Sequence, residues 1–269
     1  MIKSFSLIQN MPMDGWSMNG TSIRFGQATS VVEEWQKIIA IDEDAARQKA
    51  IDSLIDTLEA DVETSGFFDA SEQIMITRGA GAMQGIKLDD REVYYNFFDN
   101  LKTLYSTATD DKEKNNVLPK AIKQTVDTYF GQYNGDEKSR LSFTTAEIDD
   151  DGEIIYPSVS VLKGKGLGAC VEKSAMAHNM WLMLGRKSHY ISSSSIHFKG
   201  ISDEAHAFTI IQNGHGNYML YDLALNNFGR LAGDPIKEML KGEPLIVSEG
   251  FRNPGIYANA CNIERENKR

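Results

Sequence analysis

Cysteine is nearly absent from the chain, since only Cys170 and Cys261 carry a thiol among 269 residues. Two cysteines cannot build a disulfide framework, so the fold has to rest on a hydrophobic core, which a chain of this length can bury. Such low usage suits a reducing compartment, or a protein that needs its thiol free.

Positive charge is also scarce, with 28 Lys and Arg against 38 Asp and Glu and a formal net charge of -10. This balance argues against nucleic acid or an anionic membrane as the main partner, because both attract basic surfaces. No apolar run approaches transmembrane length, and the one at the N-terminus is too short for a signal peptide. We therefore expect a cytoplasmic protein, or one that is exported without a cleaved signal.

The hydrophobic pattern changes near residue 135. Before it, apolar residues recur every three to four positions over 31–64, 89–108 and 118–130, which predicts helices. After it, the pattern favours strands and turns, with extended segments at 141–145 and 154–156 around a solvated acidic hairpin tip at 149–152. We predict an α+β fold with a mostly helical region at 1–135, a core at 136–250 and a C-terminal tail at 251–269.

One stretch combines a glycine-rich loop, a lone thiol and an apolar helix. The sequence Gly164-Lys-Gly-Leu-Gly-Ala-Cys170 precedes a run over 171–184 that is apolar on most sides, and Gly185 follows as a stop. A thiol at a helix start faces unpaired backbone N–H groups and the positive end of the dipole, and both favour the nucleophilic thiolate. A buried structural cysteine is the simpler alternative.

A second stretch predicts a β-hairpin that carries a histidine and an aspartate. Strand-like runs at 204–212 and 216–223 flank Asn213-Gly214. A hairpin symmetric about Gly214 places His206 directly opposite Asp222, within reach of a carboxylate–imidazole hydrogen bond. The other ring nitrogen could then face a thiol, as in a catalytic triad, although a buried His–Asp pair could also merely satisfy itself.

Taken together, Gly168-Ala-Cys170-Val-Glu-Lys-Ser-Ala, Glu204-Ala-His206-Ala-Phe and Tyr221-Asp222-Leu resemble the core of the transglutaminase-like cysteine enzymes. The resemblance covers about residues 155–230. It implies a papain/transglutaminase-like core, in which a buried helix carrying the cysteine packs on an antiparallel sheet carrying the histidine and the aspartate. Phe208 stands where the family usually has Trp, and no Pro-containing stretch follows Asp222, so no subfamily is indicated.

The resemblance implies catalytic roles for Cys170, His206 and Asp222. Transglutaminase-like enzymes act on carboxamide groups of proteins or peptides, as deamidases, cross-linking enzymes, amidases or peptidases, and include bacterial toxins and effectors. We expect no cofactor. Candidates for oxyanion or substrate contacts are Gly168, Ala169, Tyr156, Gln212 and Asn226. The unassigned helical region 1–135 is a candidate surface for substrate recognition.

Three other readings compete with this one. A metal site could use His178, His189, His197 or His215, but the sequence has no Cys-x-x-Cys, no His-Glu-x-x-His and no tight histidine pair. A binding module that has lost its activity could retain the same three residues. A thiol acyltransferase with a small acyl donor would share the Cys–His–Asp order, although no coenzyme-binding sequence is evident.

Overall fold

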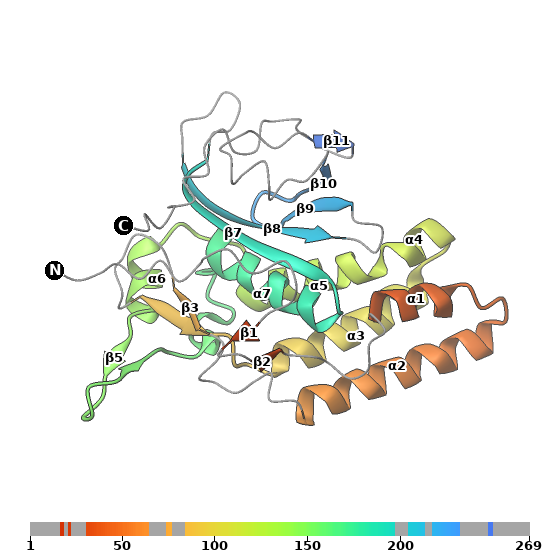
Figure 1. Ribbon diagram of the computed structural model, residues 1–269, viewed down its shortest axis with the longest axis horizontal. Coiled ribbons are helices and arrows are strands. Elements are labelled where there is room, and N and C mark those ends of the chain that lie inside the picture. Colours follow the sequence, from red (N-terminus) through yellow and green to blue (C-terminus); the bar gives the residue numbers. More distant parts are fainter. Residues whose placement is uncertain are drawn as a thin grey trace.

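The computed structural model describes residues 17–18, 21–22, 31–64, 74–76, 84–196, 204–212, 217–231 and 247–249 (Figure 1). Within these ranges the chain is a mixed helix and sheet structure of the α+β class. The predicted tail at 251–269, Cys261, His197 and His215 lie outside the described residues.

Helices dominate the N-terminal half, as the hydrophobic spacing predicts. They are α1 (Val31–Ile39), α2 (Asp44–Thr64), α3 (Glu92–Thr107), α4 (Asp111–Asn115) and α5 (Val117–Phe130). Helix α5 ends where Gly131 takes a φ of 74°, a left-handed value that glycine adopts at little cost. Two short antiparallel pairs, β1 (Ser17–Met18) with β2 (Thr21–Ser22) and β3 (Ile74–Ile76) with β4 (Gly85–Lys87), accompany the helices.

Of the segment 141–145, predicted to be extended, residues 141–143 instead belong to helix α6 (Glu137–Phe143), and Thr145 forms a single antiparallel bridge with Gln84. The Asp136 side chain accepts a hydrogen bond from the backbone N–H of Ser139 at 3.0 Å, which caps the helix start. Arg140, one turn further on, pairs with Glu137. Capping and this pair outweigh the strand-like run of Leu, Phe and Thr.

The acidic hairpin follows α6. Strands β5 (Glu147–Ile148) and β6 (Ile154–Ile155) pair around the tip at 149–153, whose side chains are exposed, as predicted. A 3₁₀ turn at Val159–Leu162 then leads to the glycine-rich loop and to helix α7 (Cys170–Met183).

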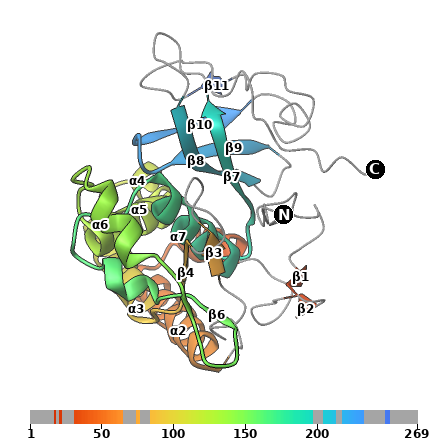
Figure 2. The same ribbon diagram turned by 90° about the vertical axis from the view of Figure 1, so that its left-hand side faces the viewer.

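Five antiparallel strands form the main sheet, in the order β11-β10-β9-β8-β7. They are β7 (Lys187–Ile196), β8 (Glu204–Gln212), β9 (Tyr218–Asp222), β10 (Asn227–Leu231) and β11 (Val247–Glu249). Figures 1 and 2 show the sheet on one side of the molecule and helices α2 and α3 on the other, with α7 and α5 between them.

Helix α7 packs on β8 and on α5. The Ser174 hydroxyl donates to the carbonyl of Ala207 at 3.0 Å, and the Thr209 hydroxyl donates to the carbonyl of Ser174 at 3.0 Å. On the next strand, Tyr221 meets Trp181 edge to face, with ring centroids 5.4 Å apart. The helix ends as predicted at Gly185, whose φ is 72°, and the N–H of Arg186 donates to the carbonyl of Trp181.

The buried side chains form one continuous cluster from Trp35 on α1 to Leu223 after β9. Residue 135, the predicted domain boundary, therefore does not separate two cores. The N-terminal helices α3 and α5 are part of the same packing that buries α7, so the helical half supports the cysteine helix directly.

The glycine-rich loop before Cys170 is fastened to the end of α5. The N–H groups of Gly164 and Gly166 donate to the carbonyls of Tyr129 and Phe130, at 2.8 and 2.9 Å, and so satisfy two C-terminal carbonyls of that helix. At Gly168 a Cβ atom would lie 2.4 Å from the buried ring of Phe130. Only glycine allows this approach, so the α5 end fixes the path of the chain into α7.

Candidate active site

Cys170 is the first residue of α7, as the sequence predicts, and its side chain is half-buried. Helix-start N–H groups have no acceptor within the helix, and the positive end of the dipole lies beside them. The thiol therefore sits in an electropositive, partly accessible position, the setting in which cysteines become reactive.

His206 on β8 and Asp222 at the end of β9 form a buried pair. The imidazole Nε2 lies 2.7 Å from Asp222 Oδ2, and the carboxylate is fully buried. The second carboxylate oxygen, Oδ1, accepts the backbone N–H of Leu225 at 3.1 Å, in the turn that follows β9. Both oxygens of Asp222 therefore have partners, which holds the carboxylate in one orientation toward the imidazole.

The strand register behind this pair differs from the one predicted. Thr209 pairs with Tyr221 and Gln212 with Tyr218, so the hairpin is centred on position 215 rather than on Gly214. The connection between the strands is thus longer than a two-residue Asn-Gly turn, and in this register Phe208, not His206, is level with Asp222. Because the shift is two residues, side-chain alternation keeps His206 and Asp222 on one face, and the two side chains meet diagonally.

Thr209 and Tyr221 contact α7 and form the outermost pair of β8 with β9. His206 lies beyond this pair on β8, and Asp222 follows it at the end of β9. The His206 ring also stacks on Phe208, with centroids 6.2 Å apart.

The thiol of Cys170 lies close enough to His206 to contribute to the pKa of the imidazole. Burial by itself lowers the pKa of His206, but the hydrogen bond to Asp222, the contribution of Cys170 and the attraction of their negative charges outweigh it and raise the pKa to about 10. The imidazole is therefore cationic at neutral pH.

A buried ion pair anchors the first turn of α7. Glu172 is fully buried, its Oε2 accepts the backbone N–H of Ala169 at 3.0 Å, and its Oε1 accepts from Nη1 of Arg140 on α6. Arg140 in turn donates from Nε to Glu137 at 2.8 Å. Burial raises the pKa of Glu172, while Arg140 opposes that shift. This link fixes the helix start on which the thiol depends.

Sequence reasoning assigned no role to Arg140 or Glu172. Glu172 is the third residue of the helix that begins after Ala169, and a glutamate at that position is a known signal of a helix start. The sequence does contain this signal. No local pattern marks Arg140 as the partner of Glu172, because the two residues are 32 positions apart.

The structure separates the five candidates for oxyanion or substrate contacts. The N–H of Ala169 is engaged by Glu172, and Gly168 packs against Phe130. Gln212 is six residues along β8 from His206, which is about 20 Å in an extended strand. Asn226 is exposed and takes a φ of 51° in the turn between β9 and β10. Tyr156 is half-buried after β6, and burial raises the pKa of its phenol.

Two of the histidines considered as metal ligands are His178 on α7, about two turns from Cys170, and His189 on β7. His178 Nδ1 contacts the Ser188 hydroxyl at 2.8 Å, and His189 on β7 is also buried. Burial, with a smaller effect from His189, lowers the pKa of His178 to about 3. Within the described ranges, no three His, Cys, Asp or Glu side chains gather in a way that could hold a metal ion.

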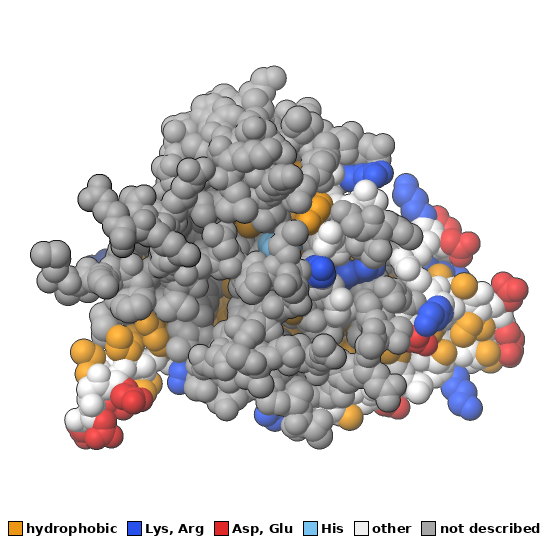
Figure 3. Space-filling model, viewed as in Figure 1, with side chains coloured by type: hydrophobic (Ala, Val, Ile, Leu, Met, Phe, Trp, Pro, Cys, Tyr) orange, Lys and Arg blue, Asp and Glu red, His pale blue; other side chains and the backbone are white. Residues whose placement is uncertain are grey.

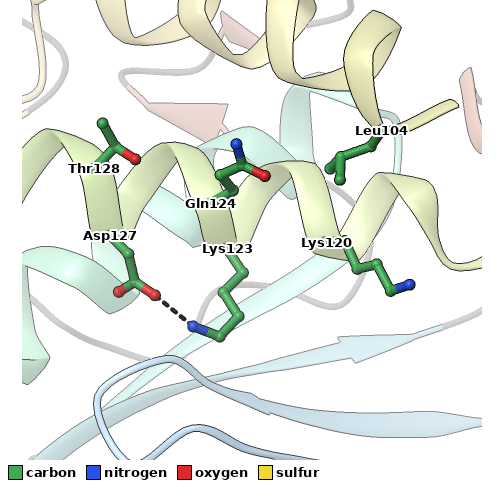
Figure 4. Close-up of a pocket in the computed structure, with 6 residues that line it drawn as sticks. All are labelled: Leu104, Lys120, Lys123, Gln124, Asp127 and Thr128. Carbon is green, nitrogen blue, oxygen red and sulfur yellow. Dashed lines mark hydrogen bonds and ion pairs between the residues drawn. The ribbon is translucent and has the colours of Figure 1, made fainter. Parts of the chain in front are cut away.

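An open depression of about 500 Å³ lies elsewhere, on the surface formed by α3 and α5 (Figure 4). Its lining includes Leu104 and Lys120, and Lys123 is paired there with Asp127. None of Cys170, His206 and Asp222 lines it, so this depression is separate from the candidate active site.

Comparison with known proteins gives no relative for this chain: no family model and no curated protein sequence matches it. In the parts of the chain that the structure describes, no helix is both long and apolar enough to cross a membrane.

The buried pair of Arg140 and Glu172 is testable through stability. We expect Arg140→Met to lower the free energy of unfolding by about 3–5 kcal/mol, because it leaves the Glu172 carboxylate buried without its cation. Adding Glu172→Leu should restore part of that loss, since the uncompensated charge is then gone. Urea unfolding measures both effects. A change below about 1 kcal/mol in the single variant would show that the pair is not an anchor.

The raised pKa of His206 predicts a pH dependence of stability. Between its ordinary value of 6.5 and about 10, the folded state holds a proton that the unfolded state has lost. The stabilisation is therefore complete below pH 6.5 and disappears as the pH rises toward 10, by at most about 1.4 kcal/mol per pH unit. Urea unfolding at pH 6 to 10 should show this decline in the wild type and a shallower one in His206→Gln; equal slopes would contradict the account.

Proposed function

We propose that the chain is a thiol-dependent amide hydrolase or acyltransferase of the transglutaminase-like kind, with Cys170 as nucleophile, His206 as general base and acid, and Asp222 as the residue that orients His206. The observation that carries the proposal is the placement of three side chains. Asp222 holds Nε2 of His206, and Cys170, at a helix start, lies near enough to raise the pKa of the same imidazole. A His–Asp pair that served only to stabilise the sheet would not need a thiol next to the imidazole.

The chemistry follows from these contacts. Because Nε2 is held by the carboxylate, Nδ1 is the nitrogen that serves the thiol. His206 already carries the proton as an imidazolium, so Cys170 reacts as its thiolate partner and attacks the carbonyl carbon of a carboxamide. The tetrahedral intermediate collapses as the imidazolium gives its proton to the departing amine or ammonia, which leaves an acyl-enzyme thioester. Water or a second amine then attacks the thioester and releases the thiol.

Negative charge on the carbonyl oxygen needs hydrogen-bond donors. The first-turn N–H groups of α7, including that of Cys170, have no intrahelical acceptor and are the backbone candidates for this role. Ala169 is removed from this role, because its N–H is bonded to Glu172. Tyr156 remains the side-chain candidate for a further donor, whereas Asn226 serves a turn and Gln212 is distant along the strand.

The substrate that we propose is a carboxamide of a protein or peptide, with deamidation of glutamine as the simplest reaction. A peptidase reaction would use the same three residues on a backbone amide. The helical half 1–135 has a structural part in the site, since α5 holds the glycine-rich loop. Its role in substrate recognition remains the hypothesis drawn from the sequence.

The proposal is tested with a blocked glutamine dipeptide, such as benzyloxycarbonyl-glutaminyl-glycine, with and without hydroxylamine. We expect ammonia release in water and hydroxamate formation with hydroxylamine. Cys170→Ala should abolish both, Asp222→Asn should reduce the rate about 10²–10⁴-fold because the imidazole loses its orientation, and Cys261→Ser should retain activity. Turnover that survives in Cys170→Ala would refute the assignment.

Peptide and protein glutamines extend the same assay if the dipeptide is too small to bind. Absence of ammonia release from all of them, with folding intact, would favour a protein-binding role for the chain.

A further inference from the structure

Exposed hydrophobic side chains concentrate in one part of the molecule. Seven large ones are exposed among the described residues, and five of these come from residues 133–155: Tyr133, Phe143, Ile148, Ile154 and Ile155. Figure 3 shows apolar side chains at the lower left, next to a cluster of carboxylates at the hairpin tip. We call Tyr133, Phe143, Ile148 and Ile154, with the carboxylates of Asp150, Asp151 and Glu153, the arm surface. Ile155, the neighbour of Ile154 in β6, points to the other face of the hairpin. Contiguous exposed apolar groups rimmed by charge mark interaction sites more often than chance.

The arm is a fixed projection. Ile148 and Ile154 are directly paired across β5 and β6, so their exposed side chains share a face. In the tip, Asp149 Oδ1 accepts the N–H groups of Asp151 at 3.0 Å and Glu153 at 2.8 Å. The side chain of Asp149 therefore shapes the turn, while the exposed carboxylates of the arm surface point outward.

The base of the arm is bonded to the body of the protein. The Gly85 N–H donates to the Thr144 carbonyl at 2.9 Å, and the Gln84 side chain bonds the hydroxyls of Thr144 and Thr145. A two-pair hairpin alone would be marginal in water, so these bonds give the arm its defined position.

Helix α6 links the base of the arm to the loop that precedes Cys170. Phe143 ends α6, and the Lys165 ammonium of the glycine-rich loop lies over its ring, 5.3 Å from the centroid. From the same helix, Arg140 reaches Glu172 in the first turn of α7. Helix α6 thus joins the arm to the start of the cysteine helix.

We propose that the arm surface docks a basic, amphipathic segment of the protein substrate. The apolar side chains would supply the contact area, and the carboxylates at the tip select a partner rich in Lys and Arg, the charge complementary to a chain of net charge -10. Calling this partner the substrate rests on the proposed function. The docking surface itself is measured without any turnover.

The probe is a fluorescein-labelled 16-residue peptide of alternating Lys and Leu with one Gln, and binding to the full chain is followed by anisotropy in 0.1 M salt. Two further peptides replace all Lys by Glu or all Leu by Ser. The arm is altered by Ile148→Ser with Ile154→Ser, and separately by Asp150→Asn, Asp151→Asn and Glu153→Gln. Glu43→Gln, Asp52→Asn and Asp56→Asn, exposed on α2 or next to it, remove the same charge elsewhere.

We expect the Lys-Leu peptide to bind at least tenfold more tightly than either replacement, and each set of arm changes to weaken it at least tenfold, with the α2 set within twofold of wild type. Absence of peptide binding to the wild type would overturn the proposal. An equal loss of affinity in the α2 variant would also overturn it, because the peptide would then be attracted by the net charge of the protein and not by the arm.

Alkylation of Cys170 by iodoacetamide checks that the arm variants retain an intact site. If the peptide docks on the arm but no glutamine substrate is ever turned over, the docking surface stands and the amide chemistry of the previous subsection is the part that fails.

Discussion

The hydrogen bond between His206 and Asp222 is the constraint on which the rest of the candidate site depends. A fully buried carboxylate is costly unless every oxygen is paired, and here the imidazole and the Leu225 N–H pair both. That requirement fixes the end of β9, the turn after it and the face of β8 that carries the histidine. It also leaves the imidazole cationic, with the Cys170 thiol as its other partner.

The thiol is positioned by a second, independent set of contacts. Backbone bonds from the glycine-rich loop to the end of α5 set the entry into α7, and the pair of Glu172 with Arg140 holds its first turn. These contacts explain why the helical half of the chain cannot be regarded as a separate attachment. Helix α5 packs on α7 and helps to bury it, and α6 holds the first turn of α7. The sheet supplies the histidine and the aspartate, so the candidate site lies where α7 meets the sheet.

The sequence predicted the local structure correctly where the apolar residues followed one clear spacing, either that of a helix or that of a strand. The helices 31–64, 89–108 and 118–130, the cysteine helix and the strand at 204–212 follow from apolar spacing and glycine stops. The contact of His206 with Asp222 was predicted through a strand register that was wrong by two residues. Because side chains alternate with a period of two, a shift of two residues leaves both side chains on the same face of the sheet. Helix α6 was missed because its stability comes from a cap and an ion pair rather than from apolar spacing. The partnership of Arg140 with Glu172 could not be read at all, since nothing local connects residues on different elements.

The central claim is that Cys170 and His206 form a working nucleophile and base, and the pH dependence of Cys170 alkylation tests it most directly. The measurement uses a Cys261→Ser background, with and without His206→Ala. The account predicts rapid alkylation that persists below pH 7, and a fall to the behaviour of an ordinary thiol, which reacts only toward its pKa of about 8.5, when the imidazole is removed. Slow alkylation that is indifferent to His206 would contradict the account and leave the His206–Asp222 pair as a structural feature of the sheet.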